Sequence, residues 1–457
     1  MDLREKIESS PMRMYQFVII GVVAFLNALD GYDVLAISFT APSIRGEFEL
    51  SGTALGLLMS AALIGMAIGA VTMGPVADRI GRRNMTVAAL IVNAAGLFLS
   101  ATAQSPAELS LWRFITGLGV GGILVGTNVI ASEYSSRKRR GLMVSIYAAG
   151  FGLGGAVGGT IMMALIDAFG WRSVYVFGGV MTILALALVL SILPESPQYL
   201  YQRQPRGAQR KLDSIARRLG YTEPVDLQAK PASLSAQEPE TSGGNEIAGL
   251  FAPGQRRVTI VIWVSFFVVM FGYYFVNSWT PTLMHDSGLT ESLAMFVTVM
   301  LTLGGAIGCV VFGLFTARWS TRQTLTWFTL LAGTLMAVFV FTANWMALVL
   351  VVGILVGFFA NGCIAGLYTL TPQSYPTRLR STGVGWGLGV GRLGAIIAPT
   401  VTGVLTDAGW TPQTIYMGVG LIILIATAAL LSMRRLDVEA NRSPREDLQA
   451  AEPQRAS

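Results

Sequence analysis

Four charged side chains lie inside stretches that are otherwise apolar and long enough to cross a bilayer. They are Asp30 and Asp33 in the first stretch, Arg113 in the fourth and Arg392 in the eleventh. An ionised side chain near the bilayer midplane is costly, so each of these needs an opposite charge, a water-filled cavity or neutralisation. This pattern predicts ion binding and proton transfer inside a membrane.

The two aspartates are three residues apart, which places them on one face of a helix. Two neighbouring carboxylates raise each other's proton affinity, and burial raises it further. One of the pair is therefore suited to carry a proton near neutral pH. A structural role, such as bonding to the backbone or to Asn27, is the alternative for each of them.

The two arginines predict different partners. Arg113 and Asp33 reach similar depths from the outer ends of their stretches at 1.5 Å per residue, so we expect them to pair. Protonation of Asp33 would then loosen the pair. Arg392 lies near the midplane without an acidic residue at that depth in its half of the chain. Its guanidinium is suited to bind a substrate carboxylate, and a structural partner is the alternative.

The elements that position these side chains are membrane-spanning helices. The chain has 457 residues, 53% hydrophobic and 13% charged, and a mean hydropathy of +0.59, which is outside the range of soluble domains. A β-barrel would show short alternating segments, whereas apolar stretches of about 20 residues indicate helices. Twelve are predicted, near 17–40, 54–76, 85–103, 108–130, 142–166, 174–193, 258–282, 292–315, 324–342, 347–370, 381–404 and 413–433.

The net charge of +6 marks one side of a membrane and does not indicate nucleic-acid binding. If the N-terminus is inside, the tails and the inner loops carry 28 of the 32 Lys and Arg residues, and the opposite side carries only Arg45 and Arg172. This asymmetry predicts that both termini are cytoplasmic. The first apolar stretch is too long for a signal-peptide core, so we expect it to be retained.

A polar segment divides the predicted helices into six and six. We expect an N-terminal six-helix bundle over 1–193, a cytoplasmic linker over 194–257, a C-terminal six-helix bundle over 258–433 and a cytoplasmic tail over 434–457. Within the linker, RGAQRKLDSIARRLG predicts a short amphipathic helix, and KPASLSAQEPETSGGNE has the composition of a disordered segment. A weak internal repeat, GPVADRIGRR against GLFTARWSTR, supports two related bundles.

The loop GPVADRIGRR resembles the signature of the major facilitator superfamily. WRFITGLGVGG and GFGLGGAVGG resemble its glycine-rich fourth and fifth helices. The resemblance implies an all-α fold of twelve transmembrane helices in two pseudo-symmetric six-helix bundles. It also implies a cytoplasmic gate, with topology-setting charge as the alternative interpretation. The implied gate residues are Asp78, Arg79, Gly81, Arg82, Arg83, Glu133 and Arg137.

The segment NALDGYDVLAISFTAP resembles the first-helix motif of the aromatic acid:proton symporter family. ASEYSSRKRRG, LPESPQYL and GVGRLGAIIAP also resemble that family. The resemblance implies proton-coupled uptake of a small aromatic carboxylate, such as benzoate or a hydroxybenzoate, by alternating access. The second-half loop departs from the pattern, with Ala317 where the first half has Asp78.

Aromatic and amide side chains are further candidates for the substrate pocket, although packing or lipid contact is the commoner role of any single aromatic. They lie on stretches expected near a central cavity. The candidates that accompany Arg392 are Asn128, Tyr147, Tyr274, Asn277, Trp279, Asn361 and Trp386.

Other functions are compatible with parts of the pattern. Proton-driven efflux of a drug or metabolite, and uptake of a non-aromatic acid such as muconate, are the alternatives within transport. A receptor would need a larger signalling domain, and an enzyme would need a nucleophile–base pair or a metal cluster. We therefore expect no enzymatic activity, no cofactor, no metal and no nucleic-acid partner. The expected partners are a carboxylate, a proton and the lipid of a bacterial inner membrane, with the protein a monomer.

Overall fold

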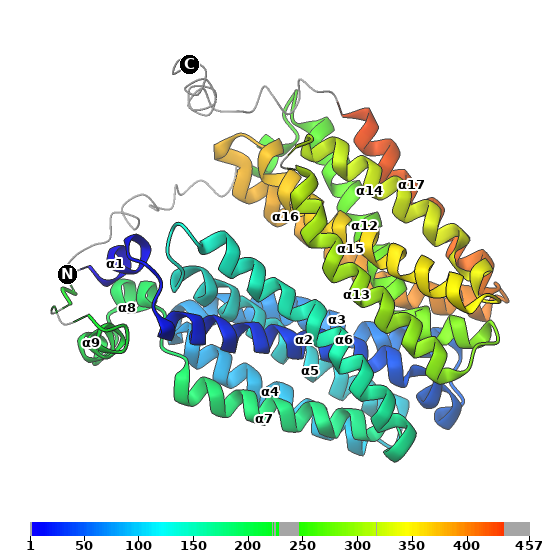
Figure 1. Cartoon of the computed structure of the whole chain (residues 1–457), viewed down its shortest axis with the longest axis horizontal. Helices are drawn as coiled ribbons and strands as arrows, with labels where there is room; N and C mark the ends of the chain where they lie inside the picture. The colour runs from blue at the N-terminus through cyan, green and yellow to red at the C-terminus, as the bar shows by residue number, and fades with distance from the viewer. Residues whose placement is uncertain (1, 222, 224, 228–245, 317, 434–457) are drawn as a thin grey trace. The chain divides into compact units, whose positions relative to one another are not determined.

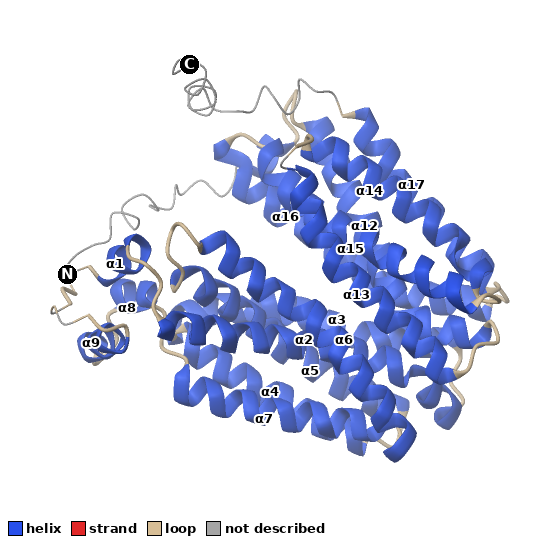
Figure 2. Ribbon diagram, in the orientation of Figure 1, coloured by secondary structure: helices blue, strands red, loops and turns tan. Residues whose placement is uncertain are grey.

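The computed structural model describes residues 2–221, 223, 225–227, 246–316 and 318–433. Its described residues are helical with connecting loops and include no strand (Figure 2). Among them, twelve helices are long and apolar enough to cross a membrane. Most of the segment expected to be disordered, the whole C-terminal tail and Ala317 lie outside the described residues.

The chain forms two compact units, residues Met1–Pro239 and Glu240–Ser457. Unit 1 contains six membrane helices: α2 (Met14–Phe48), α3 (Gly52–Ile80), α4 (Arg82–Thr102), α5 (Pro106–Glu133), α6 (Arg140–Phe169) and α7 (Arg172–Ile192). Unit 2 contains the other six: α12 (Arg256–Asp286), α13 (Glu291–Thr316), α14 (Thr321–Phe339), α15 (Met346–Ser374), α16 (Thr377–Asp407) and α17 (Pro412–Ser432). A 3-10 turn, η1 (Val340–Thr342), follows α14.

The two units share their two most extensive helix pairs and differ in the third. In unit 1 the most extensive pairs are α3 with α5, α2 with α6, and α4 with α5 (Figure 1). In unit 2 they are α13 with α15, α12 with α16, and α14 with α17. The fold is therefore an all-α membrane fold of two pseudo-symmetric six-helix bundles.

Helix starts and stops follow local chemistry. Ser51, Ser105 and Thr411 cap the helices that follow them with their hydroxyl oxygens, which satisfies an otherwise unbonded N–H. Prolines occupy the first position of α5 and α17, where a missing N–H costs nothing. Several helices extend past the predicted apolar stretch: α2 covers 35 residues and α12 covers 31.

Among the described residues, four short helices lie outside the bundles: α1 (Leu3–Ser9), α8 (Pro197–Arg203), α9 (Ala208–Arg218) and α11 (Glu246–Leu250). The first three gather at the end of unit 1 where α2 begins (Figure 1). The α9 helix is the amphipathic helix that the linker sequence predicts. Leu212 and Ile215 are buried on one face, while Arg210 and Arg217 are exposed on the other.

Candidate functional site

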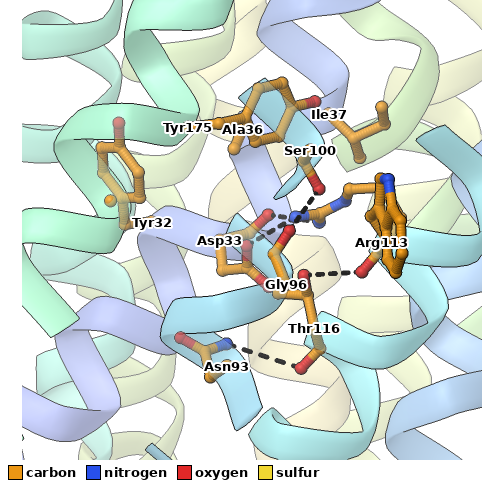
Figure 3. A network of polar contacts seen from close by, with 12 residues as sticks. Tyr32, Asp33, Ala36, Ile37, Asn93, Gly96, Ser100, Arg113, Thr116 and Tyr175 are labelled. Carbon is orange, nitrogen blue, oxygen red and sulfur yellow. Dashed lines mark hydrogen bonds and ion pairs between the residues drawn. The ribbon is translucent and has the colours of Figure 1, made fainter. Parts of the chain in front are cut away.

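A buried ion pair joins α2 to α5 inside unit 1. The Arg113 Nη1 atom lies 2.7 Å from Asp33 Oδ1, and Nη2 donates to the backbone carbonyl of Asp33 at 3.1 Å (Figure 3). Arg113 is 1% exposed and Asp33 5%. The expected pairing of these residues is therefore present. Because the guanidinium contacts both the carboxylate and the backbone, neutralising the carboxylate would remove one attachment and leave the other.

Close helix packing places this pair. A Cβ added to Gly31 would overlap the carbonyl oxygen of Phe151, and one added to Gly154 would overlap that of Ala28. Only glycine permits α2 and α6 to approach this closely in a medium that gives no hydrophobic drive for helix association. Gly31 lies between the two aspartates in the sequence. Its close contact with α6 therefore also sets the direction in which both aspartates of α2 point.

Aromatic side chains of the same unit enclose the pair. The Arg113 guanidinium carbon lies 5.5 Å from the centroid of the Tyr175 ring, within the range of a cation–π contact. The Tyr175 hydroxyl and Thr40 Oγ1 are 2.9 Å apart, and Tyr32 donates to the backbone carbonyl of Val174 at 2.7 Å. These contacts attach α7 to α2 on both sides of Asp33. Tyr32 and Tyr175 could not be predicted from the sequence, because aromatic residues that enclose an ion pair follow no pattern that separates them from other aromatic residues of membrane helices.

Asp30 lies one turn before Asp33 and is 7% exposed. One turn further back, Asn27 Nδ2 donates to the backbone carbonyl of Tyr147 at 2.8 Å. The Tyr147 hydroxyl and Thr127 Oγ1 are 3.1 Å apart. A polar ladder therefore follows one face of α2 and reaches α5 and α6. Of the pocket candidates in unit 1, Tyr147 belongs to this ladder and Asn128 is exposed.

In unit 2 the charged residue of the membrane region is Arg392 on α16. It is half-buried, and its Nη1 atom lies 3.4 Å from the Tyr274 hydroxyl of α12. Tyr274 is 8% exposed. Arg392 and Tyr274 are thus brought together, as expected for two members of one pocket. A 3.4 Å contact is long for a hydrogen bond of a charged donor, so it holds Arg392 weakly.

Two other α12 candidates have their N–H groups bonded within the unit. The Trp279 indole donates to the backbone carbonyl of Pro399 at 3.0 Å, and the side chain is 0% exposed. Asn277 Nδ2 donates to the carbonyl of Tyr273 at 2.8 Å. The Trp279 N–H is therefore already bonded to the Pro399 carbonyl in this structure. Proline at 399 leaves an earlier carbonyl of α16 without its usual N–H partner, and Trp279 packs beside this irregular turn.

The remaining pocket candidates differ in exposure. Asn361 on α15 is half-buried and faces Gly305 of α13. Trp386 on α16 is 44% exposed and stacks on Trp263 of α12, with ring centroids 5.8 Å apart. Among the described residues, no group of three or more His, Cys, Asp or Glu side chains is arranged to hold a metal ion.

The expected gate residues surround the start of α4. Arg82 Nη2 lies 2.6 Å from Asp78 Oδ1, one turn back across the break at Gly81. Glu195 Oε1 accepts from the Arg83 backbone N–H at 3.0 Å, and Arg83 Nη2 donates to the Leu190 carbonyl at 2.7 Å. The carbonyl of Arg79 accepts from Tyr199 at 3.2 Å. The segment LPESPQYL resembles the family, but no pattern within it predicts that Glu195 caps α4.

Two further carboxylates complete this end of unit 1. Glu133 is 8% exposed and accepts from the Ser196 hydroxyl at 2.6 Å. Glu8 of α1 lies 2.8 Å from Arg140 and 3.4 Å from Arg137. Burial alone would raise the pKa of Glu8, but the hydrogen bond and positive charge of Arg140 outweigh it and lower the pKa. Glu8 was also missed, since a lone acid in a basic tail gives no signal of a tertiary contact.

Comparisons with known proteins decide the family. The model described as Major Facilitator Superfamily matches residues 23–236 and 262–455. The chain belongs to the major facilitator superfamily. It is 33% identical over 433 residues to the 4-hydroxybenzoate transporter PcaK of Pseudomonas aeruginosa, covering 94% of this chain and 95% of that protein. It is 32% identical over 432 residues to a gallate transporter of Pseudomonas putida, with 94% of each covered.

A more distant relative and a solved structure agree with this assignment. A gentisate transporter of Corynebacterium glutamicum is 27% identical over 418 residues, covering 91% of this chain and 85% of that protein. The inward-open structure of the xylose transporter XylE from E. coli has a TM-score of 0.70 at 18% identity, covering 91% of this chain and 96% of that one. The latter shows the fold alone. The curated relatives confirm the resemblance to the aromatic acid transporters of the superfamily.

Proposed function

We propose that this membrane transporter takes up a small aromatic carboxylate, such as benzoate or a hydroxybenzoate, together with a proton. The observation that carries the proposal is the buried Asp33–Arg113 pair, in which a carboxylate on α2 contacts a guanidinium on α5 inside an otherwise apolar bundle. The names of the relatives, which include 4-hydroxybenzoate and gallate transporters, support this class of substrate.

Asp30 and Asp33 form the proton site in this proposal. Asp33 pairs with Arg113, whereas Asp30 lies buried on the same helix face one turn away. A proton that neutralises Asp33 weakens the attachment of α2 to α5, while the Arg113 contact to the Asp33 carbonyl persists. Proton binding then changes the contacts between α2 and α5 but keeps one of them. It can therefore shift the equilibrium between the two conformations of alternating access without unfolding the bundle.

Arg392 holds the substrate carboxylate in this proposal. Its guanidinium is half-buried, and its Nη1 atom lies 3.4 Å from the Tyr274 hydroxyl. A carboxylate offers two charge-assisted hydrogen bonds in the planar geometry that a guanidinium matches. Tyr274 supplies a hydroxyl beside the guanidinium, which can donate to the same carboxylate. The remaining candidate pocket residues are Asn128, Tyr147, Asn277, Asn361 and Trp386.

The topology follows from the basic residues. With the N-terminus in the cytoplasm, α1, α8 and α9 and the gate residues around Gly81 are all cytoplasmic, in accordance with the positive-inside rule. Residues 194–257 then form a cytoplasmic linker and 434–457 a cytoplasmic tail. We expect a monomer in the inner membrane of a bacterium.

Uptake into proteoliposomes tests the proposal. Labelled 4-hydroxybenzoate is offered with an imposed inward proton gradient, with the gradient reversed, and without a gradient. We expect accumulation only with the inward gradient, competition by benzoate and gallate, and little competition by muconate. Extrusion driven by the opposite gradient without uptake would favour an efflux antiporter. Strong competition by muconate with none by benzoate would point to a non-aromatic acid.

Variants at the proton site sharpen the test. Asp33→Asn and Asp30→Asn are compared with wild type across pH, both for gradient-driven accumulation and for counterflow, in which labelled substrate exchanges with unlabelled substrate without net proton movement. We expect accumulation to be lost in at least one variant while counterflow persists. Unchanged gradient-driven accumulation in both variants would contradict the assignment of the proton site.

A further inference from the structure

A cavity of about 190 Å³ lies at the end of unit 1, apart from the ion pair and from the pocket candidates. Its walls come from the start of α4, the end of α7 with the turn that follows, and one side of α9. Its size is below the range of roughly 300–1,000 Å³ that is usual for sites of drug-sized ligands. It is therefore suited to a compact chemical group.

The cavity has an excess of positive charge. Arg83, Lys211 and Arg218 contribute three cationic groups, and Glu195 contributes one carboxylate. That carboxylate is already engaged, because its Oε1 atom accepts from the backbone N–H groups of Arg83 and Ser196, each at 3.0 Å. Ser214 adds a hydroxyl group to the wall, whereas the Ser191 hydroxyl in the same wall already donates to the Ala187 carbonyl at 2.8 Å. This combination of basic and hydroxyl groups fits a phosphate ester.

An apolar path leads away from the cavity along α7. Val176, Val180, Ile183, Leu184 and Leu190 are each between 42% and 51% exposed. Their spacing of three, four and seven residues places them along one side of the helix. Leu190 belongs both to this stripe and to the cavity wall. A ligand with a charged head and hydrocarbon chains would use both features, whereas free phosphate would use only the first.

The α9 helix brings cationic groups to the edge of the protein core. Leu212 and Ile215 are buried against the unit, and Lys211 and Arg218 lie at the edge of this buried face, beside Ile215 in the cavity wall. A Lys or Arg near the membrane surface attracts anionic lipid headgroups. Arg218 also lies over the Tyr15 ring, 5.7 Å from its centroid, and donates to the Tyr15 hydroxyl at 3.1 Å. This contact places Arg218 where α2 enters the membrane.

We propose that this cavity binds the phosphate headgroup of an anionic phospholipid, with Arg83, Lys211 and Arg218 around the phosphate and an acyl chain along the exposed side of α7. The site lies apart from the ion pair and the substrate-pocket candidates, and it shares Arg83 with the expected gate. It requires that the chain spans a membrane, but not that the substrate is an aromatic acid. The bound lipid would connect α4, α7 and α9, and so stabilise the loop in which Glu195 caps α4.

Lipid binding by the full-length protein in detergent micelles tests the proposal. The probes are fluorescent phosphatidylglycerol and phosphatidylcholine, with inorganic phosphate as competitor. We expect saturable binding of phosphatidylglycerol, much weaker binding of phosphatidylcholine and no displacement by millimolar phosphate. The variant Lys211→Gln/Arg218→Gln should bind phosphatidylglycerol about thirtyfold more weakly, given about 1 kcal/mol for each basic group.

The matched control is Arg210→Gln/Arg217→Gln, which removes the same charge from exposed positions of the same helix outside the cavity wall. We expect it to bind phosphatidylglycerol about as tightly as wild type does. Equal weakening in both double variants would show diffuse attraction to a basic surface and overturn the proposal. Equal affinity for the two lipids, or complete displacement by phosphate, would also overturn it. The single variant Lys211→Gln leaves the contact between Arg218 and Tyr15 in place. Weaker lipid binding by this variant therefore reflects the missing cation and not a misfolded α9.

Discussion

The corresponding starts of α4 and α14 are capped in different ways in the two units. In unit 1, Gly81 occupies the cap position with φ 104° and ψ 150°, and the carboxylate of Glu195 accepts the N–H of Arg83 from a segment 112 residues away. In unit 2 the aligned residue is Ser320, whose own hydroxyl accepts the N–H of Gln323 at 3.3 Å. The first cap depends on tertiary structure, and the second is local.

The same contrast appears inside the membrane region. Unit 1 buries an ion pair between α2 and α5. In unit 2 the corresponding helix α15 contains no charged residue, and the charge lies on α16, held by a long contact to Tyr274. Unit 1 therefore contains the Asp33–Arg113 ion pair, and unit 2 contains the half-buried cation Arg392. This difference agrees with our proposal that unit 1 carries the proton and unit 2 binds the carboxylate.

Removing Arg113 should have the largest effect on the protein. Arg113→Met leaves the Asp33 carboxylate buried without its ion-pair partner, which typically costs about 3–5 kcal/mol. We expect a strong loss of thermal stability in detergent, measured by fluorescence size-exclusion chromatography after heating, and no uptake. The equivalent loss should not occur when a charge is removed from unit 2.

The double variant Asp33→Asn/Arg113→Met is the control for this prediction. It removes both charges, so most of the lost stability should return, while uptake stays absent. If the single variant is as stable as wild type, the pair is not a stabilising element of unit 1. In that case the contrast between the two bundles would lose its energetic basis.

Removing Arg392 should separate function from stability. Arg392→Met deletes a side chain that is half-buried, whereas Arg113 is fully buried in an ion pair, so thermal stability should fall much less than in Arg113→Met. Loss of charge-assisted bonds to a carboxylate costs about 1.5–3 kcal/mol, which predicts roughly a tenfold to hundredfold rise in the substrate concentration for half-maximal uptake. Arg392→Lys should recover only part of this. A stability loss like that of Arg113→Met would mean that Arg392 is structural.

The sequence predicts the scaffold and the ion pair because both follow from the cost of placing polar groups in lipid. Apolar length predicts the twelve helices, and depth along two helices is enough to bring Arg113 to Asp33. The sequence does not predict which donors are already bonded. Trp279 is a pocket candidate by residue type, but its N–H is bonded to the Pro399 carbonyl. Glu195 caps α4 because the turn after α7 lies beside the start of α4, and no local sequence pattern encodes that position.

Exchanging the two cap residues sharpens the comparison of α4 with α14. A non-glycine residue at the Gly81 dihedral angles costs roughly 1–3 kcal/mol, and its Cβ would also overlap the Glu195 carboxylate. We expect Gly81→Ser to lower thermal stability clearly. Ser320→Gly loses only a local cap and should cost a few tenths of a kcal/mol. Similar losses in both variants would indicate that the two starts are equivalent.

The attachment of α1 should depend on pH, with the smallest effect of the four. The pKa of Glu8 is lowered from its ordinary value of 4.5, so its contribution is complete above that value and is lost as the pH falls through the lowered pKa. Burial also raises the pKa of Tyr201 to about 12, so this phenol stays neutral and continues to accept from Leu3 at 3.0 Å. Loss of the Glu8 charge should therefore loosen α1 without releasing it.

Hydrogen exchange of residues 3–9 at acidic and neutral pH measures this effect. We expect faster exchange in acid for wild type, and fast exchange at both pH values for Glu8→Gln, since its amide cannot pair with Arg140. Glu5→Gln, at an exposed position on the same helix, should behave like wild type. Identical pH responses in Glu8→Gln and wild type would assign the change to another group. Because α1 contacts the α5–α6 turn through Glu8 and α8 through Tyr201, partial release distinguishes the two attachments.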